Sequence, residues 1–156
     1  MSLHDDKVAL QSALDAGRVT ILGERGVPSA SASFLLGLSA LPPSFRRLGL
    51  ARACAAPWAN AGKEMPECFR RELARAEADA REERGDASEL QARLETLFAP
   101  DPAPISEHLL RQITDLTPVR RYFSLIFAIT DEDAPPWLQR ELEYAKWIAH
   151  DDYRGG

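Results

Sequence analysis

Cysteine, histidine and lysine are scarce in this sequence, and their scarcity excludes several kinds of site. The 156 residues include 2 cysteines and 3 histidines, and lysine occurs only at Lys7, Lys63 and Lys146. Two cysteines, each inside a predicted helix, do not provide a disulfide framework. The histidines lack the short paired spacings of a zinc site, so we expect neither a metal nor another cofactor.

Long apolar runs are also missing. The longest one, SASFLLGLSAL, is broken by serine and glycine and is too short to cross a bilayer. The first ten residues include two adjacent acids and no apolar core segment, so they do not resemble a secretory signal. A hydrophobic content of 45% with 28% charged residues is ordinary for a globular chain. We therefore expect a cytoplasmic protein without membrane contact, folded as a single domain over residues 1–156.

What the sequence does contain is a strong set of helix signals. Prolines stand before several amphipathic stretches, where they favour the first turn of a helix, and apolar residues recur every three or four positions. The pattern predicts an all-α bundle of about six or seven short helices, with an extended segment at 18–22. Helix signals occur at 5–16, 29–41 with Ser29 as the cap, 44–56, 66–84, 86–98, 105–116, 117–130 and 134–152.

Two of these stretches resemble each other. The segments PECFRRELARAEADA and PPWLQRELEYAKWIA align without gaps at an offset of 69 residues, and the preceding helices begin with LPPSFRR and LTPVRR at a different spacing. A duplicated helix pair predicts this similarity, and so does chance, because helices rich in Ala, Arg, Glu and Leu share letters easily. If the pair is duplicated, sub-units at 1–99 and 105–156 are joined by a proline-rich connector at 100–104.

Charge is distributed unevenly along the chain. Residues 16–58 carry five arginines and one glutamate, whereas residues 131–156 carry seven acids and three basic residues. This asymmetry favours a basic protein partner at the C-terminal end, or a homo-oligomer in which the two oppositely charged regions meet. Two separately solvated faces are the simpler explanation, and the pattern favours them. The chain has no basic stripe interleaved with aromatics, so we expect no nucleic-acid partner.

No catalytic motif is present, and the clustered arginines are the only candidates for anion binding. They are Arg46, Arg47 and Arg52 in one cluster and Arg120 and Arg121 in another, and all but Arg52 fall in the first turns of their predicted helices. Positive charge there opposes the helix dipole, so an acidic group, either within the protein or on a ligand, would relieve it.

The last predicted helix has an unusually wide apolar face. On a helical wheel its apolar arc is about 200° wide, whereas a helix resting on one core shows an arc of roughly 100°. One interpretation is that the helix fills a groove between two others. The other is that leucine and alanine pack inward while the aromatic residues meet a partner inside an acidic rim. The residues predicted for that partner site are Trp137, Glu141, Tyr144, Trp147, Asp151 and Asp152. Among them the pattern favours burial of Trp137 and leaves the exposure of Trp147 open.

These observations predict a non-enzymatic protein-interaction module, such as an adaptor, a chaperone or an immunity-type protein of a bacterial cell. An apolar surface surrounded by charge is typical of protein-binding sites. The alternative is a small-molecule-binding protein or enzyme with an arginine-lined pocket between helices. An exposed Trp/Tyr surface would favour the first function, and a cavity lined by arginines would favour the second.

Overall fold

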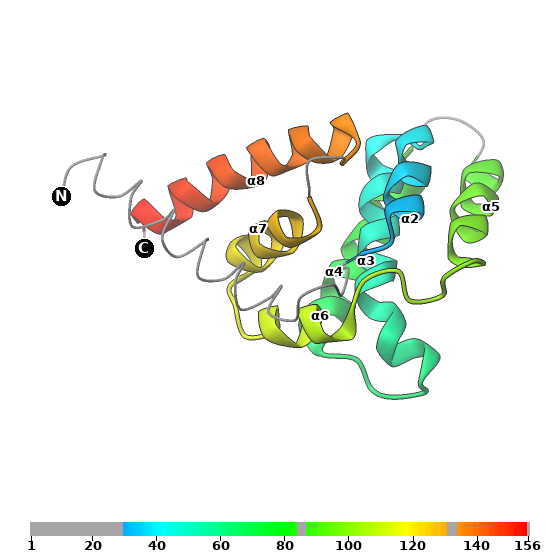
Figure 1. Ribbon diagram of the computed structural model, residues 1–156, viewed down its shortest axis with the longest axis horizontal. Coiled ribbons are helices and arrows are strands. Elements are labelled where there is room, and N and C mark those ends of the chain that lie inside the picture. Colours follow the sequence, from blue (N-terminus) through cyan, green and yellow to red (C-terminus); the bar gives the residue numbers. More distant parts are fainter. Residues whose placement is uncertain (1–29, 84–86, 131–133, 156) are drawn as a thin grey trace. The chain divides into compact units, whose positions relative to one another are not determined.

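The computed structural model of the chain describes residues 30–83, 87–130 and 134–155, and Figure 1 shows their helices. Within these ranges there are seven α-helices and one short 3-10 helix, η1, which confirms the predicted all-α fold. The helix predicted at 5–16 and the extended segment at 18–22 lie outside the described residues. The elements are α2 (Ala32–Gly37), η1 (Leu38–Ala40), α3 (Pro43–Asn60), α4 (Glu67–Arg81), α5 (Ala87–Phe98), α6 (Glu107–Ile113), α7 (Pro118–Ile129) and α8 (Pro136–Gly155).

The helices belong to two compact units. One consists of residues 30–107 and is called the α3–α4 unit below; the other includes residues 108–156 and is called the α7–α8 unit. The predicted connector at 100–104 lies inside the first. There Asn60 donates a hydrogen bond to the carbonyl oxygen of Pro102 at 3.0 Å, and the Ser31 amide donates to that of Pro104 at 2.8 Å. These bonds hold the connector against the helices of its own unit.

Helices α3 and α4 pack against each other and form the centre of the first unit. The Trp58 indole of α3 lies 5.5 Å from the Phe69 ring of α4, and both side chains are buried. This contact also explains a boundary that the sequence predicted wrongly. We expected α3 to end near residue 56, but the helix continues through Pro57 to Asn60. A proline inside a helix removes one backbone hydrogen bond, and the burial of Trp58 offsets that loss.

The N-terminal cap of α2 also differs from the predicted one. The cap is Ser31, whose hydroxyl oxygen accepts a hydrogen bond from the Phe34 amide at 3.4 Å, so α2 begins later than the stretch predicted from Ser29. The predicted inward face is confirmed, because its four large apolar residues are all buried. They are Phe34, Leu35, Leu38 and Leu41.

In the second unit, α7 and α8 lie side by side (Figure 1). Phe123 of α7 packs with Ala145 and Ala149 of α8, and each of the three is at most 3% exposed. The small alanine side chains let the two helices approach closely around the phenyl ring. Leu142, half-buried on the same side of α8, contacts this cluster.

Helices α3 and α4 form one hairpin, and α7 and α8 form another. All four helices begin with the same arrangement of hydrogen bonds. The fourth residue of each helix donates from its side chain to the carbonyl oxygen five positions earlier. The bonds are Arg46 to Leu41 at 2.7 Å, Arg70 to Met65 at 3.4 Å, Arg121 to Leu116 at 2.7 Å and Gln139 to Ala134 at 2.9 Å. In each case a proline stands at the first helical position or just before it. The residues that precede α3, α4 and α7 are Pro42, Pro66 and Thr117, and none of them forms a side-chain cap hydrogen bond. A side chain at the end of the first turn therefore binds the backbone that leads into the helix.

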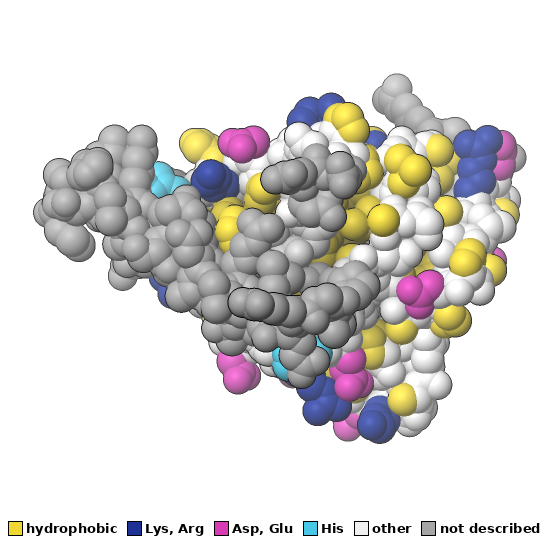
Figure 2. Space-filling view, in the orientation of Figure 1, with side chains coloured by type: hydrophobic (Ala, Val, Ile, Leu, Met, Phe, Trp, Pro, Cys, Tyr) yellow, Lys and Arg dark blue, Asp and Glu magenta, His cyan; other side chains and the backbone are white. Residues whose placement is uncertain are grey.

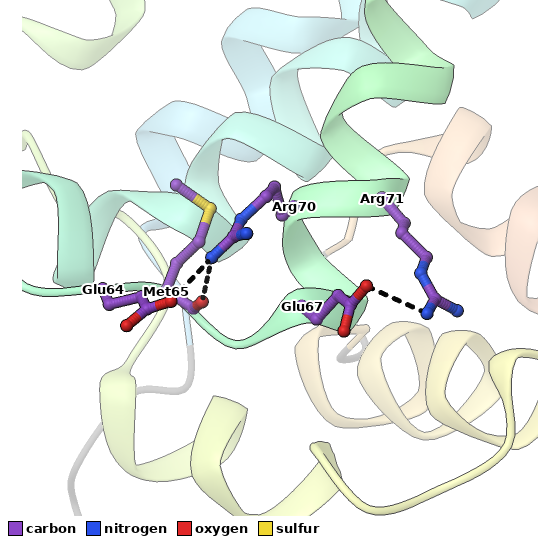
Figure 3. A network of polar contacts seen from close by, with 5 residues as sticks. All are labelled: Glu64, Met65, Glu67, Arg70 and Arg71. Carbon is purple, nitrogen blue, oxygen red and sulfur yellow. Dashed lines mark hydrogen bonds and ion pairs between the residues drawn. The ribbon is translucent and has the colours of Figure 1, made fainter.

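Figure 3 shows this arrangement at the start of α4. Arg70 turns back toward the entering chain, where it also pairs with Glu64 at 3.3 Å. Arg71 points the other way and pairs with Glu67 at 3.0 Å, as the four-residue spacing predicted. The guanidinium of Arg70 thus joins the first turn of α4 to the loop before it.

The two hairpins follow the same local plan, with one difference in length. Helices α4 and α8 each begin one residue after the prolines that align at an offset of 69, and both loops before them contain six residues. Helix α3 has 18 residues and α7 has 12, so the six extra residues of α3 account for the different spacing at the starts of the first helices. The shared start geometry supports the interpretation of the two hairpins as related units.

We predict that the arginine bond stabilises the start of α3. Replacing Arg46 with methionine keeps most of the packed side chain but leaves the Leu41 carbonyl without its charged donor. The free energy of unfolding should therefore fall by about 1–2 kcal/mol. Urea unfolding followed by circular dichroism measures this. The matched control is Arg47→Met, one residue along and exposed, which should change stability by less than about 0.5 kcal/mol. Equal effects of the two substitutions would contradict the role of this bond.

Candidate functional site

The most unusual surface feature of the described residues is a pair of aromatic side chains on α8. Trp147 is 68% exposed and Tyr144 is 51% exposed. They are three positions apart, so they lie on the same face of the helix one turn apart. Large aromatic side chains are usually buried in a folded domain because each covers a large apolar area. Two neighbouring exposed ones indicate a surface that the other described residues do not cover.

The residues of the wide apolar arc of α8 differ in how far they are exposed. Trp137 is only 6% exposed, so it belongs to the interior and not to the predicted partner site. Leu138, Ala145 and Ala149 are also buried, on the side that contains the contact with α7. The arc is wide because it combines an interior face with a second, exposed aromatic face.

Comparison with α4 shows that the helix does not need aromatic residues on that face. At the offset of 69, the buried positions correspond: Phe69, Ala76 and Ala80 of α4 match buried residues of α8. The positions that match Tyr144 and Trp147 are Arg75 and Ala78, and both are exposed. A similar hairpin therefore folds with a charged and a small residue there. The aromatic pair of α8 is therefore not needed for a hairpin of this kind to fold.

Charged side chains border the aromatic pair. Arg140 and Glu143 are exposed and lie one turn before Tyr144 and Trp147. We call Arg140, Glu143, Tyr144 and Trp147 the α8 face. On the side of the molecule drawn in Figure 2, basic and acidic side chains are interspersed and form no large patch of one sign.

The predicted acidic rim is only partly in place. Glu141 is half-buried and accepts a hydrogen bond from the hydroxyl of Tyr122 on α7, so its carboxylate holds the two helices together. Its place in the partner site stays a prediction, although this carboxylate already has a partner within the unit. Asp151 and Asp152 lie in the last turns of α8, but their side chains are outside the described residues.

The predicted anion site is also corrected. Arg46 and Arg121 each donate to a backbone carbonyl oxygen at 2.7 Å, and Arg121 is 6% exposed. The acceptor that their position at a helix start demanded is therefore within the protein. Arg47 and Arg120 are exposed on α3 and α7, which belong to different units. The four arginines do not line one pocket within either unit.

A different pair of arginines does line a pocket. A pocket of about 470 Å³ in the α3–α4 unit has Arg52 of α3 and Arg81 of α4 in its wall. Arg81 stands four residues after Glu77, a spacing typical of a surface ion pair, so the sequence gives no sign of a pocket there. Only the packing of three helices reveals the pocket.

The described residues contain no group of three or more His, Cys, Asp or Glu side chains placed to hold a metal ion. A search of the helices in the described ranges finds none long and apolar enough for a membrane span. Comparison of the chain with protein-family models, with curated proteins and with solved structures finds no match. The geometry of α8 is therefore the main support for a function.

Proposed function

We propose that this protein is a protein-interaction module that binds a basic partner protein through the α8 face. The observation that carries the proposal is the 68% exposure of Trp147, beside a second exposed aromatic side chain. Tryptophan and tyrosine are the residues that most often dominate the binding energy of protein interfaces, together with arginine. They provide a large contact area on a side chain with only two rotatable bonds, so little conformational entropy is lost on binding.

The charge of the C-terminal segment, counted from the sequence, favours a partner rich in arginine or lysine. Residues 131–156 carry seven acids and three basic residues. An opposite charge on the partner speeds the encounter and selects against wrong partners. A cation can also stack on the exposed indole, a contact worth about 0.5–2 kcal/mol depending on how far it is removed from water. The expected partner segment therefore combines an arginine or lysine with an apolar side chain.

A photo-crosslinker placed in the α8 face tests this proposal directly. We would replace Tyr144 with benzoylphenylalanine, which keeps an aromatic ring there and leaves Trp147 in place, and irradiate cells of the source organism. The matched control is the same replacement at Arg75, the exposed position of α4 that corresponds to Tyr144. We expect a discrete cross-linked protein from position 144 and none of that species from position 75.

Mass spectrometry of the cross-linked segment identifies which protein lies against the α8 face. The proposal requires that the segment carries arginine or lysine next to an apolar residue, and that the yield falls with Glu143→Lys, which reverses an exposed charge on the face. The same species from both positions, or an acidic segment, would rule it out. A cross-linked second copy of this chain would point to self-association, which sedimentation at low and high salt would then verify.

A further inference from the structure

We propose that the pocket of the α3–α4 unit binds a small organic anion, and that Arg52 holds its negatively charged group. This site is separate from the α8 face, and the inference does not depend on the proposed function. The pocket, about 470 Å³, lies among α3, α4 and α5. Pockets that bind small molecules usually have volumes of about 300–1,000 Å³ and mostly apolar walls with a few polar groups.

Arg52 is held in place from one side. Its guanidinium carbon lies 5.0 Å from the centre of the Phe98 ring of α5. Phe98 is fixed in turn by an edge-to-face contact with Phe34 of α2, whose ring centre is 5.0 Å away at an interplanar angle of 63°. The guanidinium is thus stacked on a ring that cannot easily move, and its orientation is set before any ligand arrives.

One nitrogen of this guanidinium lacks a partner. The Nη1 atom of Arg52 is buried and has no hydrogen-bond partner. A buried N–H group without an acceptor costs free energy, and a buried charge costs more. Arg52 is also absent from the ion pairs that the described residues form, all of which involve other arginines. Arg52 lines the pocket, so a carboxylate or phosphate there would accept a charge-assisted hydrogen bond from its guanidinium and offset part of the cost of enclosing the charge.

The other polar groups of the pocket are available to the same ligand. Glu77 and Arg81 stand four residues apart on α4, where an ion pair is expected, yet no ion pair joins them in the structure, although Glu67 and Arg71 on the same helix do pair at 3.0 Å. Both line the pocket, with Gln91 of α5. Arg81 and Gln91 can donate to an anion, and Glu77 can accept from a hydroxyl or amine.

Apolar side chains form the floor of the pocket beneath the polar groups. Phe45 and Leu48 come from α3 and Ala80 from α4, and all three side chains are buried. The polar groups of the wall therefore define the ligand class, a small organic carboxylate or phosphate monoester.

Titrations of the full chain with two aromatic anions test the site. We would follow ¹H–¹⁵N spectra, including the Arg52 Nε–H signal, with benzoate, with phenyl phosphate and with the neutral benzyl alcohol as control. We expect saturable shifts from at least one anion at Arg52 and at the amides around Leu48 and Ala80, and none from benzyl alcohol. Which anion binds more tightly distinguishes a carboxylate ligand from a phosphate ligand.

Variants identify the groups responsible. Arg52→Gln should weaken binding about tenfold or more, because it removes both the charge and the fork. The matched control Arg47→Gln removes the same charge from an exposed position of α3 and should leave affinity within about twofold. Arg81 is exposed, so Arg81→Gln leaves the fold intact and should weaken binding about threefold even if Arg52→Gln does not fold. No saturable shift from either anion, equal binding of benzyl alcohol, or unchanged affinity in Arg81→Gln would overturn the proposal.

Discussion

Replacing Phe69 with alanine is expected to lower the free energy of unfolding by about 3–5 kcal/mol, the largest effect on stability among the substitutions considered. The side chain is 1% exposed and lies at the start of α4, where its ring packs 5.5 Å from the Trp58 indole of α3. Truncation removes most of the apolar contact between the two helices at this end and leaves a cavity that the surrounding helices only partly fill. Urea unfolding followed by circular dichroism at 222 nm measures the change.

A matched control separates this contact from the general loss of an apolar side chain. Leu36 belongs to the same unit but is 65% exposed, so Leu36→Ala should change stability by less than about 0.5 kcal/mol. A loss below about 1 kcal/mol for Phe69→Ala would show that the α3–α4 contact is not a main source of stability.

Much of the fold is readable from the sequence, because prolines and apolar spacing are local signals. Pro43 and Pro118 each occupy the first position of a helix, as predicted, and the inward faces of α2 and α8 follow the three- and four-residue spacing. Boundaries that depend on contacts between helices were less accurate. The extension of α3 past Pro57 is an example, because it depends on the packing of Trp58 against a side chain of the next helix.

The arginines show more clearly what cannot be predicted from the sequence alone. Their position at helix starts correctly indicated a need for an acceptor, but the sequence does not say that Arg46 and Arg121 reach the backbone carbonyl five residues earlier. That choice depends on the extended backbone before the first turn, at Pro42 and Thr117. Arg52 was not separated from its neighbours in the sequence, and it differs from them only because the Phe98 ring lies beneath it.

The aromatic residues of α8 could be ranked only in part from the sequence. The pattern favoured burial of Trp137, which is 6% exposed, but left open Trp147, which is 68% exposed. A helical wheel gives the angle between them but not which angles the rest of the fold covers. The signal that the sequence did contain was the width of the apolar arc, which exceeds what a single neighbouring helix can cover.

Trp147→Ala is expected to weaken binding of the cross-linked partner by about 30-fold or more, since interface tryptophans at hot spots contribute about 2 kcal/mol or more when truncated. The indole is 68% exposed in the chain alone, so its removal leaves no cavity and should not lower the thermal unfolding midpoint. Isothermal titration of the purified partner measures the affinity, and calorimetry of the variant alone measures the stability. Lys146→Ala is the control, because it changes an exposed neighbour about 100° away on the helix and should leave affinity within about twofold. Retained affinity in Trp147→Ala, or equal losses in both variants, would show that the partner does not dock on this face.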